Sequence, residues 1–419
     1  MNERRRRPRP DARGASGQGA PWLRWVLLLA ALFLLQACGG LPRHPVPEHR
    51  ADGARALPGV PAVRAWSGSF SAQFEDDLIL SVRQARAASL LSGAGLPLSS
   101  DILAISGGAD YGAFGAGLLC GWTAAGTRPD FKIVTGISAG ALLAPFVFLG
   151  PDYDEAMKAA FTRTSARDIY HHRWLSVFWS DGLVDTTPLA RLIARNFDGP
   201  FLQAVAAAHL SGRRLYVGTT NLDADRLVVW NMGAIAASGH PDAPALFRKI
   251  VLASSSIPAV FPPVMIDVEV DGAWYDELHV DGGVKAQVFL TAASVDIARI
   301  RQDLARSQVS LPPTRLYVLR NAKIVPEPEP TRRTLMDIVD RSTTAFIKSQ
   351  ARGDLYQIHA VAEEQDFDFR WVAVPHDFAP NPEATYFDTS EMNRLFAVGY
   401  EMGLSPDPWY REPPGFDTH

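Results

Sequence analysis

A serine between two glycines is the feature of this sequence that points most directly to chemistry. The pentapeptide 136–140 reads G-x-S-x-G and lies between two apolar stretches. A serine in this setting sits at a sharp strand-to-helix turn, where the N–H groups of the helix N-terminus favour developing negative charge. We therefore predict that Ser138 is a nucleophile and that Gly136 and Gly140 make its turn possible.

A nucleophilic serine needs a base, and Asp281 is the sharpest candidate. It follows the strand-like residues 277–280, and Gly282 and Gly283 after it allow close approach of the backbone. A carboxylate held against the serine hydroxyl can take its proton directly when partial burial raises its basicity. This arrangement needs no imidazole.

A mechanism that depends on histidine is the alternative. In α/β-hydrolases the order along the chain is Ser, acid, His, and the late histidines here are His359 and His376. His359 lies in a stretch that we expect to be helical, and His376 follows a Val-Pro pair. Neither lies in a glycine-framed loop after a clear strand, so we favour the pair of Ser138 and Asp281.

A glycine-rich loop precedes the serine turn. Gly107 and Gly108 follow the apolar stretch 102–105 and stand 31 and 30 residues before Ser138. If the two strands are adjacent and parallel, the two loops meet at one edge of the sheet, and the glycines let backbone N–H groups form an oxyanion hole. A dinucleotide-binding loop is the competing interpretation, but the serine turn occupies the place where its acidic residue should end the second strand.

The stretches around these loops predict the fold. Short apolar runs of strand length alternate with helical stretches of small and apolar residues, which is typical of a parallel sheet covered on both faces. We expect an α/β fold with three layers, a mostly parallel central sheet and helices on both faces. After residue 290 we expect additions to the same sheet, namely a strand at 315–320, a long helix at 331–362 and a second strand at 369–374.

Composition excludes several other classes of protein. The chain has 419 residues, with 41 Lys and Arg against 45 Asp and Glu, 47% hydrophobic residues and two Cys. This apolar content supports a large core and excludes general disorder. A net charge of −4 gives no basic excess for nucleic acid, and two Cys cannot form a disulfide framework or a four-thiolate zinc site.

The N-terminus reads as an export signal. Residues 1–37 carry seven Arg against two acidic residues, and their apolar run is shorter than the roughly 20 residues that span a bilayer. Leu-Gln-Ala-Cys at 35–38 resembles the lipobox of bacterial lipoproteins, in which the Cys is acylated. That resemblance implies a lipid anchor on Cys38 in the bacterial cell envelope and, since Gly39 is not Asp, the outer membrane.

The ordered set of motifs resembles one family, the patatin-like phospholipases. The glycine loop, the serine pentapeptide and the Asp-Gly-Gly triplet occur in that family's order, and residues 219–223 and 253–263 are similar to it as well. The resemblance covers about residues 102–290, which is under half of the chain. An ordered set of this kind is far more specific than one pentapeptide.

This resemblance implies a catalytic dyad and a reaction. It makes Ser138 the nucleophile, Asp281 the base and the amides of Gly107 and Gly108 the oxyanion donors. The supporting positions of the motifs are Gly112, Gly136, Gly140, Gly282 and Gly283. The implied activity is hydrolysis of fatty-acyl esters of lipids, of the phospholipase A or lysophospholipase type, without a metal or organic cofactor.

Two positions of the glycine loop depart from the family pattern. Ala109 stands in place of a third glycine, and Tyr111 stands in place of an Arg or Lys. Alanine has less conformational freedom than glycine, and tyrosine brings no fixed positive charge near the oxyanion. Because the dyad is intact, we expect an active enzyme with an altered head-group preference or rate. A non-catalytic envelope lipoprotein that binds lipid in the same pocket is the alternative.

The remaining interpretations are structural. We expect a signal peptide at 1–37, a Pro-rich tether at 38–66 and an N-terminal lead-in at 67–101. A catalytic region at 102–290, a C-terminal extension on the same domain at 291–403 and a Pro-rich tail at 404–419 should follow. The serines 254–256 could hydrogen-bond around the site and Asn221 could orient the serine turn, but we favour a cap or turn at a helix end for the serines and a strand end for Asn221. Cys120, in an apolar stretch, should pack as a small hydrophobic residue.

Overall fold

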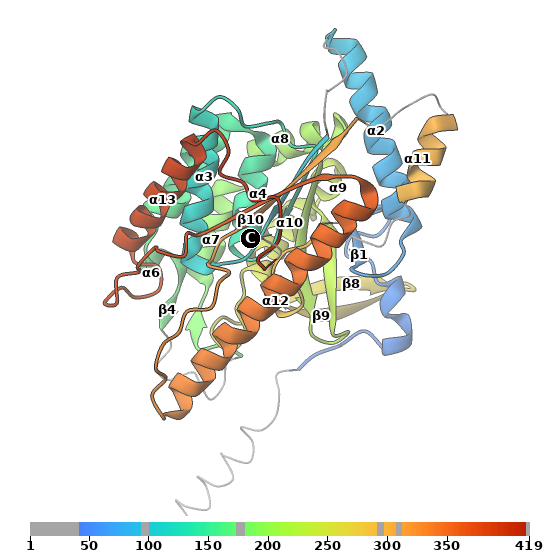
Figure 1. The fold of residues 1–419 in the computed structure, drawn as a ribbon. Helices are drawn as coiled ribbons and strands as arrows, with labels where there is room; N and C mark the ends of the chain where they lie inside the picture. The colour runs from blue at the N-terminus through green and yellow to red at the C-terminus, as the bar shows by residue number, and fades with distance from the viewer. Residues whose placement is uncertain (1–41, 94–99, 173–180, 291–296, 307–311, 416–419) are drawn as a thin grey trace, which may run out of the picture. The chain divides into compact units, whose positions relative to one another are not determined.

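A sheet of nine strands lies at the centre of the fold (Figure 1). The computed structural model describes residues 42–93, 100–172, 181–290, 297–306 and 312–415. The main path of the sheet is β1-β7-β6-β3-β2-β10-β11, and β9 pairs with both β6 and β8. The strands are β1 (Arg64–Trp66), β2 (Ser100–Ile105), β3 (Ile133–Gly136), β6 (Arg214–Asn221), β7 (Arg226–Asn231), β8 (Val264–Val270), β9 (Ala273–Asp281), β10 (Thr314–Arg320) and β11 (Asp368–Ala373); a separate pair consists of β4 (His171–His172) and β5 (Val184–Asp185).

The strands that flank the two glycine-containing loops are parallel, as the sequence predicted. β11, β10, β2, β3 and β6 pair in parallel, and in β2 and β3 Ile105 lies opposite Gly136. The loops that follow β2 and β3 therefore leave the sheet at the same edge. Beyond β6 the pairings with β7 and β9 are antiparallel, an arrangement that the sequence did not indicate.

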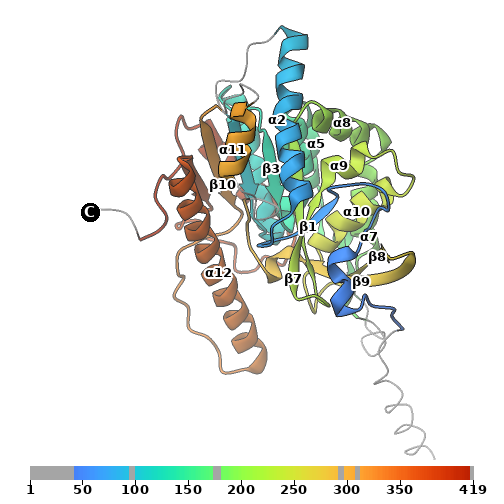
Figure 2. The ribbon, with the colours of Figure 1, turned by 90° about the vertical axis from the view of Figure 1, so that its right-hand side faces the viewer.

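Helices cover both faces of the sheet, which confirms the three layers (Figure 2). Alternate residues of β2 point to opposite faces of the sheet. Leu103 and Ile105 belong to a core that includes residues of α3 and α4, whereas Ile102 and Ala104 belong to a second core that includes residues of α12. The helices of eight residues or more are α2 (Ala72–Ser92), α3 (Gly112–Ala124), α4 (Ala139–Leu149), α5 (Asp154–Thr162), α7 (Thr187–Asn196), α8 (Gly199–Leu210), α10 (Ala243–Ser254), α11 (Ile297–Arg306), α12 (Leu335–Gln365) and α13 (Thr389–Leu404); α6 (Ala166–Ile169) and α9 (Met232–Ala237) are shorter.

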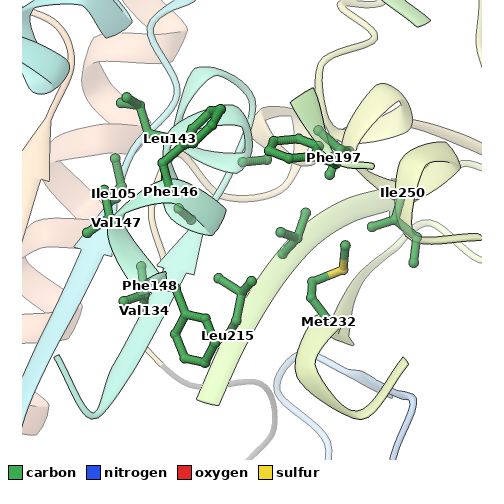
Figure 3. Packing of buried hydrophobic residues seen from close by; sticks show 14 of the residues in the cluster. Ile105, Val134, Leu143, Phe146, Val147, Phe148, Phe197, Leu215, Met232 and Ile250 are labelled. Atoms are coloured by element: carbon green, nitrogen blue, oxygen red, sulfur yellow. The ribbon is translucent and has the colours of Figure 1, made fainter. Parts of the chain in front are cut away.

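The core next to the serine turn is almost entirely apolar. Leu143 and Val147 of α4 are buried together with Ile105 of β2 and Val134 of β3 (Figure 3). Phe146, on the same helix, lies 5.3 Å from Phe197 between ring centroids. Burial of this kind contributes roughly 1.5–3 kcal/mol per large side chain, so the start of α4 is held firmly in place.

The C-terminal region is part of the same sheet. β10 lies between β2 and β11, and α12 packs with its buried residues Leu355 and Ile358 on these strands. β10 ends at Arg320, beside the loop that follows β2, since Leu319 pairs with Ile105. Residues far outside the motif region therefore reach the edge where the motifs meet.

The N-terminal segment departs from the expected tether. Leu57 and Val63 are buried in the main core, and β1 pairs with β7 as the outer strand of the sheet. These contacts are made with distant strands, so no local apolar period signalled them in the sequence. The predicted tether is therefore wrong for residues 44–66, whereas the predicted signal peptide and Cys38 lie outside the described residues.

In the described ranges, no helix combines the length and the apolar character needed to cross a bilayer.

Candidate active site

Ser138 occupies the turn between β3 and α4 in a strained conformation. Its φ of 56° and ψ of −123° lie outside the common regions for a residue with a side chain, at a cost of roughly 1–3 kcal/mol. A Cβ atom on Gly136 would lie 2.3 Å from the carbonyl oxygen of Gly140, and one on Gly140 would lie 2.3 Å from that of Ile105. Both glycines are therefore required by packing, and the turn presents Ser138 at the N-terminus of α4.

Asp281 and Ser138 are brought together by β6, which pairs both with the strand before Ser138 and with the strand that ends at Asp281. β6 lies parallel to β3, with Val217 opposite Gly136, and antiparallel to β9, with Thr219 opposite Asp281. This register places the end of β9 beside the serine turn. The side chain of Ser138 lies close enough to the Asp281 carboxyl group to lower its pKa, so the two predicted residues are neighbours in the structure.

The backbone around Asp281 fixes its carboxylate. Its N–H donates to the carbonyl oxygen of Ser256 at 2.9 Å, and its carbonyl oxygen accepts from the Thr220 hydroxyl at 3.0 Å. The N–H of Gly283 donates to Oδ1 of Asp281 at 2.7 Å. A Cβ atom on Gly282 would lie 2.6 Å from the carbonyl oxygen of Gly218, so the position after Asp281 has to be glycine.

Burial changes the acidity of this carboxyl group. Asp281 is 6% exposed, and its burial raises the pKa to about 6, although the nearby Ser138 side chain and the hydrogen bond from the Gly283 N–H act in the opposite direction. A pKa near neutrality suits a general base, because the group is ionised at pH 7 and still accepts a proton readily. This is the raised basicity that the sequence argument required.

The glycine loop lies against Ser138, but its two amides differ. A Cβ atom on Gly107 would lie 3.0 Å from the Cβ atom of Ser138, and one on Gly108 would lie 1.9 Å from the carbonyl oxygen of Asn321. The N–H of Gly107 donates to the carbonyl oxygen of Gln287 at 3.2 Å. In this structure the Gly107 amide therefore already has an acceptor, which no local pattern could have indicated, and its role as an oxyanion donor stays a prediction.

Ser254 contributes to the site through hydrogen bonds, which the sequence analysis placed second to a role at a helix end. Its Oγ accepts the N–H of Ser138 at 3.0 Å and donates to the carbonyl oxygen of Gly218 at 2.7 Å. The expected role at a helix end is wrong for Ser254, although it holds for Ser255 and Ser256, whose hydroxyl groups donate to carbonyl oxygens one turn earlier. A run of three serines gives no signal of which one faces inward.

The two unusual loop residues have clear structural settings. Ala109 adopts a φ of 49°, a left-handed conformation in which glycine is favoured. The ring of Tyr111 lies 6.4 Å from that of Phe378 between centroids, edge to face. Burial raises the pKa of Tyr111 to about 12, so this side chain is neutral at pH 7.

An apolar cavity of about 50 Å³ lies next to the loop. Ala109 and Leu142 line it at the end near the serine turn, since Leu142 is one helical turn after Ser138 in α4. Its other walls come from α5, α6, α7 and α13, and Thr164 and Asn196 are its polar side chains. Such a space accommodates aliphatic groups.

The histidines lie in other environments. His359 packs against the ring of Phe369 from α12, and His376 is exposed after β11. His279 is buried in β9, where its Nδ1 hydrogen-bonds with the hydroxyl of Thr219 at 2.9 Å. Among the residues that the structure describes, no group of three or more His, Cys, Asp or Glu side chains could hold a metal ion.

Two plainer predictions have the expected setting. Asn221 ends β6, and its Oδ1 accepts the N–H of Ala224 in the following turn. Cys120 is a half-buried thiol in α3 that packs against the main core.

Comparison with known proteins identifies the region that holds Ser138 and Asp281. Residues 103–294 match the family model of the patatin-like phospholipases. No curated protein matches the chain. Among solved structures, it is similar to VipD from Legionella pneumophila, with 11% identity over 74% of this chain and 66% of that one and a TM-score of 0.38. It is also similar to the human GIVD cytosolic phospholipase A2, with 10% identity over 77% of this chain and 53% of that one and a TM-score of 0.31.

The chain thus spans 66% and 53% of the lengths of these two proteins. The family model begins at the strand before the glycine loop and ends after the Asp-Gly-Gly triplet, so it includes all three motifs. Residues 103–294 of this chain are therefore similar to the patatin-like phospholipases across all three motifs.

Proposed function

We propose that this protein hydrolyses fatty-acyl esters of lipids with Ser138 as its nucleophile and Asp281 as its base. The observation that carries the proposal is the position of the Ser138 side chain beside the buried carboxyl group of Asp281, whose pKa burial raises to about 6. The reaction type is carboxylic-ester hydrolysis, of the phospholipase A or lysophospholipase kind. Its steps need no metal or organic cofactor.

The chemistry takes place in two stages. In the first, Oγ of Ser138 attacks the acyl carbonyl carbon while Asp281 takes the hydroxyl proton and passes it to the leaving alcohol. In the second, Asp281 takes a proton from water as the water oxygen attacks the acyl carbonyl carbon, and it returns this proton to Oγ of Ser138 as the bond to the acyl group breaks and the fatty acid leaves. The Gly108 amide and the N-terminus of α4 supply the positive electrostatic environment for the oxyanion in both stages.

The apolar cavity fits the acyl chain of such a substrate. Ala109 of the glycine loop and Leu142, which follows the serine turn, both line the cavity. An ester whose carbonyl lies at Ser138 can place the first methylene groups of its chain here. The gain is about 0.8 kcal/mol for each methylene group removed from water, which favours lipids over small polar esters.

Labelling with a fluorophosphonate probe tests the proposal. The full-length protein should react with one probe molecule, and mass spectrometry should locate the adduct on Ser138, because only a serine activated by a base reacts readily. A protein that hydrolyses no acyl ester and is not labelled would instead be a non-catalytic lipid-binding protein. Labelling that is lost when His359 or His376 is replaced would favour the histidine-dependent mechanism.

We also propose that Cys38 carries a lipid anchor that holds the protein in the bacterial envelope, at the outer membrane. The support is the sequence alone, namely the basic leader and the Leu-Gln-Ala-Cys motif. In cells that express the full chain, Cys38→Ser should move the protein from the membrane fraction to the soluble fraction, because acyl chains on this Cys supply the anchoring energy. Cys120→Ser is the matched control and should leave the distribution unchanged. A Cys38→Ser protein that remains in the membrane fraction contradicts the anchor.

A further inference from the structure

Arg320 is a buried cation directly behind the glycine loop. It is the last residue of β10 and only 4% exposed. Its Nη1 lies 3.3 Å from the Ser106 hydroxyl, 3.3 Å from Oε1 of Gln287 and 3.5 Å from the carbonyl oxygen of Gly107. Although burial lowers the pKa of Arg320 to about 10, the guanidinium is charged at pH 7.

The polar partners of Arg320 converge on one peptide group. The carbonyl oxygen of Gly107 accepts from the Ser106 hydroxyl at 2.7 Å, and Arg320 adds a charged donor to the same oxygen. The Ser106 hydroxyl oxygen in turn accepts the backbone N–H of Asn321 at 2.9 Å. The residues that close β10 therefore hold the Gly107 carbonyl toward Arg320.

This orientation has a consequence for the next amide. The peptide bond between Gly107 and Gly108 is trans, so the carbonyl of Gly107 and the N–H of Gly108 point in opposite directions. A carbonyl that faces Arg320 leaves the N–H of Gly108 facing away from it. A positive charge on the carbonyl side also polarises the peptide and strengthens its N–H as a donor.

Among the residues that the structure describes, the guanidinium of Arg320 forms no close ion pair. Within the described residues its three hydrogen-bond acceptors are the uncharged groups named above, and its Nε has no partner. Asp354 of α12 acts on the Arg320 charge electrostatically, but its carboxylate accepts the N–H of Gln287 at 2.6 Å. Burial raises the pKa of Asp354 to about 6. The positive field of Arg320 therefore acts on the loop.

We propose that Arg320 is the positioning residue of the oxyanion site: it fixes the Gly107 carbonyl and thereby orients and polarises the Gly108 N–H. It supplies, from a strand outside residues 103–294, the positive charge that Tyr111 does not bring to the loop. This inference rests on the proposed acyl hydrolysis. It explains how a loop with a neutral Tyr111 and an occupied Gly107 amide stabilises an oxyanion.

The first test compares two replacements of Arg320 in the full-length protein, with a short-chain acyl ester as substrate. Arg320→Gln keeps N–H donors but removes the charge, and kcat should fall about 10²-fold with KM changed less than threefold, the size expected for loss of one oxyanion donor. Arg320→Lys keeps the charge and should retain a larger part of kcat. Arg315→Met is the matched control on the same strand, since Arg315 pairs with Asp101 and should leave kcat unchanged.

A second-site variant separates electrostatics from folding. In the Arg320→Gln background, Tyr111→Arg should raise kcat at least tenfold, because it restores a positive charge at the place where the family carries one. Thermal unfolding of each variant shows whether it is folded. An Arg320→Gln enzyme with undiminished kcat overturns the inference, and so does a loss of kcat that follows the loss of stability and is not restored by Tyr111→Arg.

The two proposals fail in different ways. If the wild-type protein hydrolyses no ester, the proposed function fails and the role of Arg320 fails with it. If the wild-type protein is active and loses activity with Ser138→Ala, but Arg320→Gln is as active as the wild type, only the role of Arg320 fails.

Discussion

Replacing Ser138 with alanine should lower the hydrolysis of acyl esters by more than about 10³-fold, because the hydroxyl that forms the acyl-enzyme is then absent. Ala can keep the backbone conformation of Ser138, including the N–H bond to Ser254. Thermal stability should therefore stay close to that of the wild type. The measurement is initial rate with a chromogenic acyl ester, together with release of fatty acid from phospholipid vesicles.

Two neighbouring serines give graded controls for this variant. Ser254→Ala removes the acceptor of the Ser138 N–H and should reduce kcat by roughly tenfold, since the turn loses one of its supports but the nucleophile remains. Ser255→Ala removes a hydroxyl that bonds only one turn back along α10, and turnover should not change. A Ser138→Ala protein that retains wild-type turnover would assign catalysis to another residue.

The local part of the site could be predicted from the sequence. Apolar runs that end in glycine loops indicated β2 and β3, and the spacing of the loops indicated that Gly107 and Ser138 lie at one edge of the sheet. Each of these inferences depends on a strand, a turn and a helix that follow one another along the chain. The sharp turn itself requires residues without a side chain, so Gly136 and Gly140 indicated the turn directly.

The long-range part could not be predicted in the same way. Asp281 meets Ser138 only because β6 pairs in parallel with β3 and antiparallel with β9, and a strand pairing across that distance leaves no mark in either segment. The bond between the Gly107 amide and the Gln287 carbonyl joins residues 180 positions apart. The same holds for Arg320, because a single Arg at the end of an apolar strand gives no sign of which loop it faces.

Replacing Asp281 with asparagine should remove activity and at the same time stabilise the protein at pH 8. The variant has no group that can take the Ser138 proton, so kcat should fall about 10³-fold. In the wild type, kcat should decline as the pH falls below about 6, where Asp281 becomes protonated. The asparagine side chain stays neutral at every pH, and the residual rate of the Asp281→Asn variant should lack that decline.

The gain in stability follows from the direction of the pKa shift. Burial raises the pKa of Asp281 from the ordinary value of 3.8 to about 6, so between these values the folded state binds the proton more tightly than the unfolded chain does. Stability therefore falls as the pH rises from about 4 to about 6, and at pH 8 the buried charge costs about 3 kcal/mol. Asparagine avoids this cost, and its side-chain oxygen can still accept the N–H of Gly283.

Denaturant unfolding at two pH values measures this effect. At pH 8 the Asp281→Asn variant should be more stable than the wild type by up to about 3 kcal/mol, and at pH 4 the two should be nearly equal. Asp267→Asn is the matched control, because the exposed carboxylate of Asp267 pairs only with Lys249 at the surface and should change stability by less than about 0.5 kcal/mol. An active Asp281→Asn protein, or one with no gain at pH 8, would contradict a buried base at this position. Loss of function together with gain of stability is the result expected of a group that is kept ionised in a buried site for catalysis and not for folding.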